Sequence, residues 1–199
     1  MSNNAQLIGM FAELCYRKRD EKLASNNPAY LKKALELQET TSRVAEWACD
    51  TFTTMDSTYN LLQDPLFSEL VQVCGQAVIE MSVNYGVEGR QLVCKDAWVN
   101  VAMPGDYQEY HQHPMSHFSV VYYVNAPEAC GNLILRSHAA DKDMMPLPTK
   151  NTDLPNAKTY FVIPQAGEIV IFRSNQTHMV DKNRSKDPRV SVALNYVFE

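Results

Sequence analysis

The second half of the chain is a series of short β-rich runs, and this pattern restricts the fold more than any other feature. Each run is rich in β-branched and aromatic residues and is bounded by Pro, Gly, Asn or Asp, as strands commonly are. The runs cover 97–102, 107–111, 118–124, 132–135, 160–163, 168–172, 177–180 and 189–198. So many short strands favour a closed barrel or two stacked sheets, in an α+β protein that is mostly β.

The preceding part of the chain has a helical period instead. Apolar residues recur at helical spacing over 6–16, and a second helix is expected to open at Asn27, which is followed by Pro. The clearest helix has Asp64 as its N-cap and Pro65 at its first position, and it stops near Gly86. We expect these helices to back a sheet.

A chain of 199 residues has the usual length of one domain. We expect a single domain over 1–199, with 1–90 as a helical support layer and 91–199 as the β core. The stretch 137–159 has no strong period and contains several Pro, Asp and Asn residues. Loops of that length in a compact domain are often functional, so we interpret it as a lid.

Composition restricts the function and the compartment. The net charge of −5 disfavours a nucleic-acid partner, because phosphate binding needs the opposite sign. The longest apolar stretches are too short to cross a bilayer, so we expect no membrane association. The first residues lack the pattern of a signal peptide, and the five cysteines include no CxxC pair. We therefore expect a cytoplasmic protein with buried thiols, and its oligomeric state stays open.

Two histidines stand two residues apart in the segment Tyr110-His111-Gln112-His113-Pro114. Side chains alternate along a strand, so both imidazoles can point to one face and reach one metal ion. The pair is a weak signal by itself, but a third histidine, His178, ends the strand and turn that begin at Gly167. Together the three residues suggest a metal centre.

The last predicted strand has an unusual face. Arg189, Ser191, Ala193 and Asn195 alternate with large apolar residues, so small and polar side chains share one side of the strand. Polar groups facing water would explain this pattern. The alternative is an enclosed lumen in which Arg189 pairs with an anion, since a buried charge needs a partner.

These motifs, in this order and spacing, resemble the 2-oxoglutarate and iron(II) dependent oxygenases, and more narrowly a family of such enzymes in bacteria and their phages. The resemblance covers Trp98 to Phe198. The segments that carry it are 98–100, 111–114, 119–124, 167–172, His178 and 189–195. It implies a double-stranded β-helix, also called a jelly roll or cupin-like fold, backed by the N-terminal helices.

The resemblance also implies roles for individual residues. His111 and His178 would bind Fe(II), and Arg189 and Ser191 would bind the distal carboxylate of 2-oxoglutarate. His113 stands where the common pattern has Asp or Glu, so either His113 or water would supply the third ligand. Asn100 would contact 2-oxoglutarate or serve as a structural amide, and His117 is a further candidate ligand.

The implied activity is that of a dioxygenase using Fe(II), 2-oxoglutarate and O2. It would hydroxylate a C–H bond of a peptidyl or small-molecule substrate and release succinate and CO2. Trp98, Tyr107, Tyr110, Tyr122 and Tyr123 could line the substrate mouth or pack in the core. Arg136 and Arg173 could pair with an acidic substrate or face solvent, and His138 is expected in the lid.

Two other functions fit parts of the sequence. Gly105 followed by the HxH pair also resembles the start of a cupin motif, which suggests a metalloenzyme that does not use 2-oxoglutarate. The Glu that usually follows that motif is missing, and this interpretation leaves Arg189 and Ser191 unexplained. A non-catalytic barrel that binds a small anion is the third interpretation.

Overall fold

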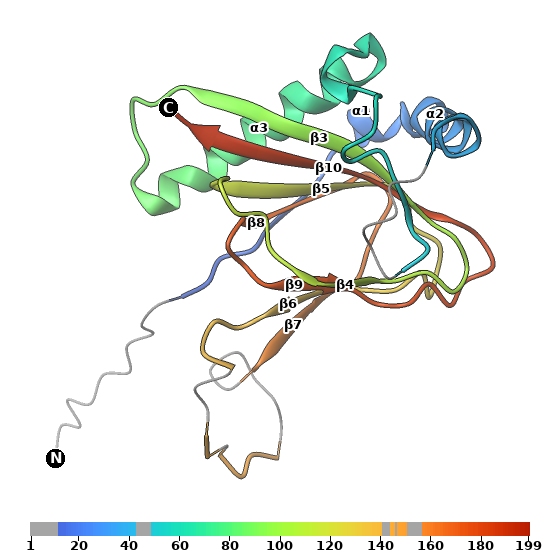
Figure 1. Cartoon of the computed structure of the whole chain (residues 1–199). Helices are drawn as coiled ribbons and strands as arrows, with labels where there is room; N and C mark the ends of the chain where they lie inside the picture. The colour runs from blue at the N-terminus through green and yellow to red at the C-terminus, as the bar shows by residue number, and fades with distance from the viewer. Residues whose placement is uncertain (1–11, 43–48, 141–143, 146, 151–156) are drawn as a thin grey trace, which may run out of the picture.

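Two antiparallel sheets face each other in the computed structural model, which describes residues 12–42, 49–140, 144–145, 147–150 and 157–199 (Figure 1). The larger sheet has six strands in the order β1-β8-β5-β10-β3-β2. These are β1 (Tyr16–Arg19), β2 (Phe52–Thr53), β3 (Leu92–Ala102), β5 (Phe118–Asn125), β8 (Glu168–Arg173) and β10 (Arg189–Phe198). The smaller sheet, in the order β4-β9-β6-β7, consists of β4 (Gln108–His111), β6 (Leu133–Arg136), β7 (Thr159–Val162) and β9 (His178–Val180).

Every strand predicted after residue 91 is present, with ends that differ by a few residues. The first predicted helix, over 6–16, is wrong over its described residues, because residues 12–15 are irregular and Tyr16 begins β1; residues 6–11 lie outside the described part. β1 pairs with the buried strand β8, and Arg17 forms an ion pair with Glu168 at 2.8 Å. Both contacts are distant in sequence, so the local helical period could not reveal them. The first 90 residues, predicted as a helical layer, therefore also contribute two strands, β1 and β2, to the large sheet.

The helices lie on the outer face of the large sheet (Figure 1). They are α1 (Glu21–Ala24), α2 (Asn27–Thr40) and α3 (Ser68–Ser82), with short 3-10 turns at Leu61–Gln63, Pro65–Phe67 and Val83–Tyr85. Asp64 caps the third helical stretch as predicted, because its carboxylate accepts a hydrogen bond from the Leu66 amide at 2.9 Å. That stretch stops at Gly86, whose φ of 68° ends the helical hydrogen bonding.

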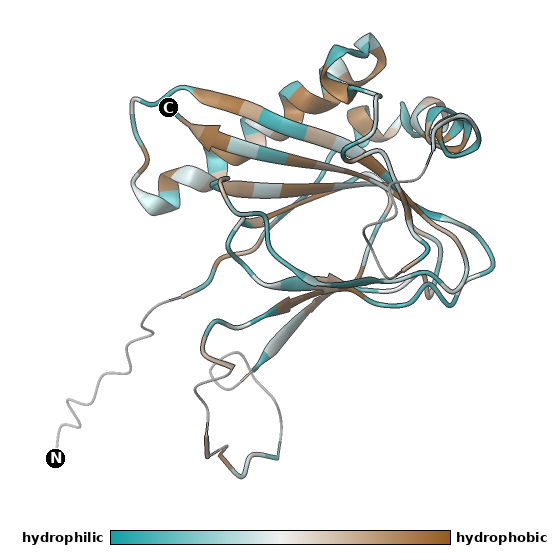
Figure 2. Cartoon of the chain, viewed as in Figure 1, coloured by the Kyte–Doolittle hydropathy of each residue, from teal (hydrophilic) through white to brown (hydrophobic). Residues whose placement is uncertain are grey.

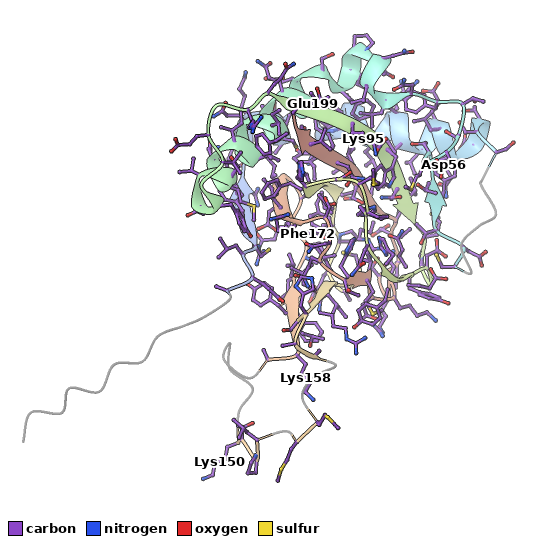
Figure 3. All side chains as sticks on the ribbon, turned by 60° about the vertical axis from the view of Figure 1, so that its left-hand side comes forward. Asp56, Lys95, Lys150, Lys158, Phe172 and Glu199 are labelled. Carbon is purple, nitrogen blue, oxygen red and sulfur yellow. The ribbon has the colours of Figure 1, made fainter. Side chains whose placement is uncertain are left out.

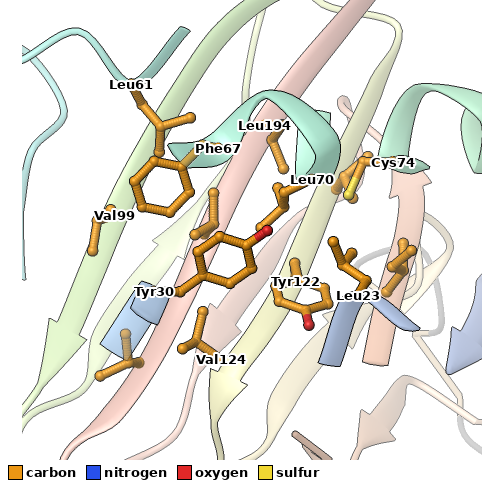
Figure 4. Packing of buried hydrophobic residues seen from close by; sticks show 14 of the residues in the cluster. Leu23, Tyr30, Leu61, Phe67, Leu70, Cys74, Val99, Tyr122, Val124 and Leu194 are labelled. Carbon is orange, nitrogen blue, oxygen red and sulfur yellow. The ribbon is translucent and has the colours of Figure 1, made fainter. Parts of the chain in front are cut away.

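The main core fills the space between these helices and the large sheet (Figure 4). Tyr30 of α2 stacks on Phe67 with ring centroids 5.2 Å apart and meets Tyr122 of β5 edge to face. Along the central strands hydrophobic and hydrophilic residues alternate (Figure 2). On β10 the apolar residues Val190, Val192 and Leu194 belong to this core. The opposite face of β10 therefore points between the sheets.

The helical stretch Pro65–Tyr85 is long and apolar enough to cross a membrane by length and composition, which the sequence analysis did not expect. Its residues Leu70, Cys74 and Val78 are completely buried in the core against the sheet. A core helix of a globular domain has this burial, and we interpret the stretch in that way.

The inner face of β10 is enclosed, which confirms the interpretation that placed its polar side in a lumen. Arg189, Ser191 and Asn195 are at most 7% exposed. A second, smaller core fills part of the space between the sheets, with Tyr123 and Phe172 from the large sheet and Leu133 from the small one. The rest of this space is a cavity lined by the inner faces of both sheets.

Candidate active site

Strands β4 and β9 of the small sheet bring three histidines together. His111 ends β4 and lies directly across from His178, the first residue of β9, in the antiparallel register. His113 follows just beyond the end of β4. One ring nitrogen from each histidine lies within 4.8 Å of the others. Within the described residues this is the one group of three His, Cys, Asp or Glu side chains that could hold a metal ion.

Local hydrogen bonds set the tautomers of two of these rings. His111 Nδ1 lies 2.7 Å from the Glu109 carbonyl oxygen, and His178 Nδ1 lies 2.8 Å from the Gln176 carbonyl oxygen. A carbonyl can only accept, so each Nδ1 carries the proton and each ring has its lone pair on Nε2. Metal-binding imidazoles are oriented by second partners of this kind.

Burial keeps all three imidazoles neutral. Burial, followed by the neighbouring His111, lowers the pKa of His113 to about 4. Burial lowers the pKa of His178 well below its usual value, and it also lowers the pKa of His111. Since a metal ion needs the unprotonated nitrogen, the site favours metal binding at neutral pH.

The large sheet forms the wall behind the histidines. The Trp98 ring lies 5.3 Å from His113, and the Phe172 ring lies 4.7 Å from His178, between centroids. Phe172 stands in the interior of the domain (Figure 3). In the register of the large sheet, Trp98 is opposite Ala193, whose small side chain leaves room in the cavity. The histidine cluster therefore lies near the middle of β10.

Arg189 lies at the other end of the same cavity and is 5% exposed. Its Nη1 donates to the carbonyl oxygens of Cys130 at 2.7 Å and Asp181 at 3.3 Å. Neutral carbonyls orient the guanidinium without neutralising it. Burial lowers the pKa of Arg189, while Tyr123, Cys130 and the nearby carboxylates of Asp106 and Asp181 raise it. A buried cation with these surroundings favours an anionic ligand.

Three polar side chains form a row beside Arg189. Ser191 is opposite Asn100 of β3 and opposite Tyr123 of β5 in the antiparallel register, so all three share the inner face. All three line the cavity. The side-chain oxygen of Asn100 is buried without a hydrogen-bond partner in the described part of the chain. This oxygen can only accept and so cannot pair with a carboxylate, whereas the NH2 group of the same side chain can donate to one.

These residues fit Fe(II) and a dicarboxylate. Three neutral imidazoles from one side suit a first-row metal ion and leave further coordination positions for oxygen ligands. Arg189 and Ala193 are four residues apart on β10, which is about 13 Å along a strand. An arginine side chain and a five-carbon diacid together can bridge that distance. The side chains of Asn100 and Arg189 both line the cavity in which such a diacid would lie.

The structure separates the other candidates from this cluster. His117 is a structural residue, because its Nδ1 accepts from the Phe198 amide at 2.9 Å. His138 contacts Glu13 at 2.8 Å at the start of the 137–159 stretch. Tyr122 packs in the main core on the other face of β5. The exposed residues Tyr107 and Tyr110 lie outside the cavity lining.

Both candidate arginines outside the cavity contact aromatic rings. Arg136 lies 5.7 Å from the Tyr110 ring centroid, and Arg173 lies 5.3 Å from that of Phe118. Arg173 also donates to the His117 carbonyl at 3.0 Å.

The sequence predicted Tyr123 as a residue of the substrate mouth or of the core and did not connect it with Arg189. Its alternation with Tyr122, which puts it on the inner face of the strand, was the available signal.

Comparisons with known proteins agree with this geometry. A family model described as "Putative 2OG-Fe(II) oxygenase" matches residues 96–195. None of the curated proteins matches the chain. A crystal structure of a Pseudomonas putida prolyl-4-hydroxylase is similar with a TM-score of 0.66 and 12% identity, covering 94% of each chain.

Two further solved structures carry ligands. HygX from Streptomyces hygroscopicus, with nickel and 2-oxoglutarate bound, has a TM-score of 0.63 and 11% identity over 93% of this chain and 83% of its own. The epimerase SnoN, in complex with Fe3+, alpha ketoglutarate and nogalamycin RO, has a TM-score of 0.64 and 14% identity over 93% and 79%. At these identities the likeness shows the fold, a double-stranded β-helix.

Proposed function

Because the chain belongs to the family of 2OG-Fe(II) oxygenases, by the match over residues 96–195, we propose that it hydroxylates an unactivated C–H bond of a peptide or small molecule. The protein is a 2-oxoglutarate- and Fe(II)-dependent dioxygenase, with O2 as cosubstrate. One observation carries the proposal: three neutral imidazoles and a buried guanidinium line the same cavity.

In this proposal His111, His113 and His178 hold the Fe(II). The donor set supports it, because the rings of His111 and His178 present their Nε2 lone pairs while backbone carbonyls hold Nδ1. His113 takes the place of the carboxylate in the common pattern. An imidazole brings no negative charge, so the metal is bound with one more positive charge and less electrostatic attraction.

Arg189 and Ser191 bind the distal carboxylate of 2-oxoglutarate, and Asn100 and Tyr123 add polar contacts along its length. The support is the enclosed polar row and the guanidinium, whose Nη1 is fixed by carbonyls. When Fe(II) and 2-oxoglutarate are bound, they supply the oxidising power for C–H hydroxylation. The overall reaction converts substrate C–H, O2 and 2-oxoglutarate into substrate C–OH, succinate and CO2, which balances in atoms and electrons.

The described neighbours suggest two substrate classes. One of these proteins is a Pseudomonas putida prolyl-4-hydroxylase, which suggests a peptidyl substrate, and HygX has also been solved with hygromycin B, a small molecule. For this chain we propose a substrate of either kind, without nucleic acid or membrane partners, and leave a homo-oligomer open. We propose one catalytic domain over 1–199, of which 91–199 is the β-helix core.

We propose a cytoplasmic location. The supporting observation concerns the cysteines, all of which lie in the described part of the chain. None of the five is in a disulfide. Thiols that stay reduced fit a reducing compartment.

The test is anaerobic addition of Fe(II) and 2-oxoglutarate to the metal-free protein. We expect a visible charge-transfer band, and under O2 we expect succinate. His178→Ala should abolish the band, whereas His138→Ala, a histidine outside the cluster, should keep it. Metal binding without any band or succinate would favour a cupin-type enzyme that does not use 2-oxoglutarate. Absence of metal binding would favour an anion-binding barrel.

A further inference from the structure

Three buried polar side chains form a continuous chain of hydrogen bonds, and two of them, Ser119 and Asn195, line the same cavity as the three histidines. Ser119 Oγ donates to Asn195 Oδ1 at 2.8 Å, and Ser119 Oγ lies 2.9 Å from Ser174 Oγ. Ser174 is fully buried, and the other two are 3% exposed. Buried polar groups are costly unless they are paired, so this network needs an explanation beyond packing.

The direction of the chain follows from its chemistry. The Asn195 carbonyl oxygen can only accept, so the single hydroxyl proton of Ser119 points to it. Ser119 must then accept from the Ser174 hydroxyl. Ser119 lies on β5 and Asn195 on β10, and both strands pair on two sides within the large sheet. Ser174 follows the end of β8, so its side-chain bond ties a turn residue to a rigid sheet.

The backbone of Ser174 holds the loop that carries His113. The His113 amide donates to the Ser174 carbonyl at 2.9 Å, and the Ser174 amide donates to the His117 carbonyl at 3.2 Å. His113 belongs to no strand, so no ladder of sheet hydrogen bonds fixes it. His111 and His178, in contrast, lie on paired strands. The hydrogen bond to the Ser174 carbonyl therefore fixes the backbone of His113 where no strand pairing does.

We propose that Ser174, Ser119 and Asn195 are positioning residues that set His113 for metal binding. The inference rests on the proposed role of His113 as a ligand. The hydrogen-bond chain fixes Ser174 against the sheet, and Ser174 fixes the loop. A ligand without a charge gains nothing from long-range attraction to the metal, so its contribution depends on being held in place before the metal arrives.

The test measures Ni(II) binding to the metal-free full-length protein by titration calorimetry, with no turnover required. Ser174→Ala removes the hydroxyl that donates to Ser119 and leaves the Ser119–Asn195 bond in place. We expect about tenfold weaker Ni(II) binding, the size usual for the loss of an outer partner of a ligand. The matched control is Tyr122→Phe, which removes a buried hydroxyl from the opposite face of β5, where it donates to Asn27 at 2.7 Å. Its Ni(II) affinity should equal that of the wild type.

The same substitution in a His113→Ala background separates this inference from the proposed function. If Ser174 acts through His113, Ser174→Ala should change Ni(II) affinity there by less than about twofold. If Ser174→Ala weakens Ni(II) binding equally in both backgrounds, the positioning role is overturned but the ligand set is not. The same holds if Ser174→Ala has no effect in the wild type while His113→Ala weakens Ni(II) binding. Unchanged affinity in His113→Ala would overturn the ligand set itself. If Ser174→Ala does not fold, Ser119→Ala breaks the same chain and takes its place.

Discussion

The sharpest test of the cavity is the removal of its buried cation by Arg189→Met. In the folded protein Arg189 is 5% exposed, and its Nη1 is held by the carbonyls of Cys130 and Asp181. In our proposal the guanidinium pairs with the distal carboxylate of 2-oxoglutarate. After the substitution that carboxylate meets only the neutral hydroxyls of Ser191 and Tyr123.

Losing one partner of a buried, hydrogen-bonded charge pair costs about 3 kcal/mol, within a common range of roughly 2–5 kcal/mol. At 1.4 kcal/mol for each factor of ten, this weakens 2-oxoglutarate binding by roughly two orders of magnitude. The assay is anaerobic titration of the Fe(II) protein with 2-oxoglutarate, followed by its charge-transfer band. Ni(II) binding to the metal-free protein should stay unchanged, because Arg189 is outside the histidine cluster.

A surface arginine provides the matched control. Arg19 lies on β1, and its side chain is 51% exposed in an ion pair with Glu21. Arg19→Met removes the same charge from the chain without touching the cavity, so its 2-oxoglutarate affinity should equal that of the wild type. Affinity of Arg189→Met within about threefold of the wild type would refute the reasoning, since a charge pair of this kind is worth much more.

Three further perturbations probe the scaffold. In Gly131→Ala the new Cβ would overlap the Asp181 carbonyl oxygen and lie 2.9 Å from Arg189 Nη1, at a backbone φ of +90°. We expect the free energy of unfolding, measured in urea, to fall by about 2 kcal/mol and 2-oxoglutarate binding to weaken. Unchanged 2-oxoglutarate binding would contradict the idea that this turn supports Arg189. Ni(II) at about a hundred times its dissociation constant should raise the melting temperature by roughly 5–10 °C, and His111→Ala should abolish the shift. Phe67→Ala removes a fully buried ring stacked on Tyr30 and should cost about 3–5 kcal/mol of unfolding free energy, with Ni(II) affinity preserved in the folded variant.

Local sequence patterns predicted much of the fold because their physical causes are local. Alternation on the last strand indicated that Arg189 and Ser191 share a face opposite Val190, and the structure confirms that this face is enclosed. Asp64 followed by Pro65 predicted a helix start from capping chemistry alone. The predicted helix over 6–16 failed over residues 12–16, where Tyr16 pairs with a distant strand instead of following the local helical preference.

The amino-acid sequence already showed which side chains could act together. The spacing of His111 and His113 allowed one shared face, and His178 and Arg189 followed in the order that the resemblance implies. That these side chains meet follows from the packing of the whole chain, because β4 and β9 pair through contacts between residues far apart in sequence. The same holds for Ser174, whose contacts with Ser119 and His113 leave no periodic trace in the sequence. Periodicity records which way a side chain points, whereas its partners depend on how the whole chain packs.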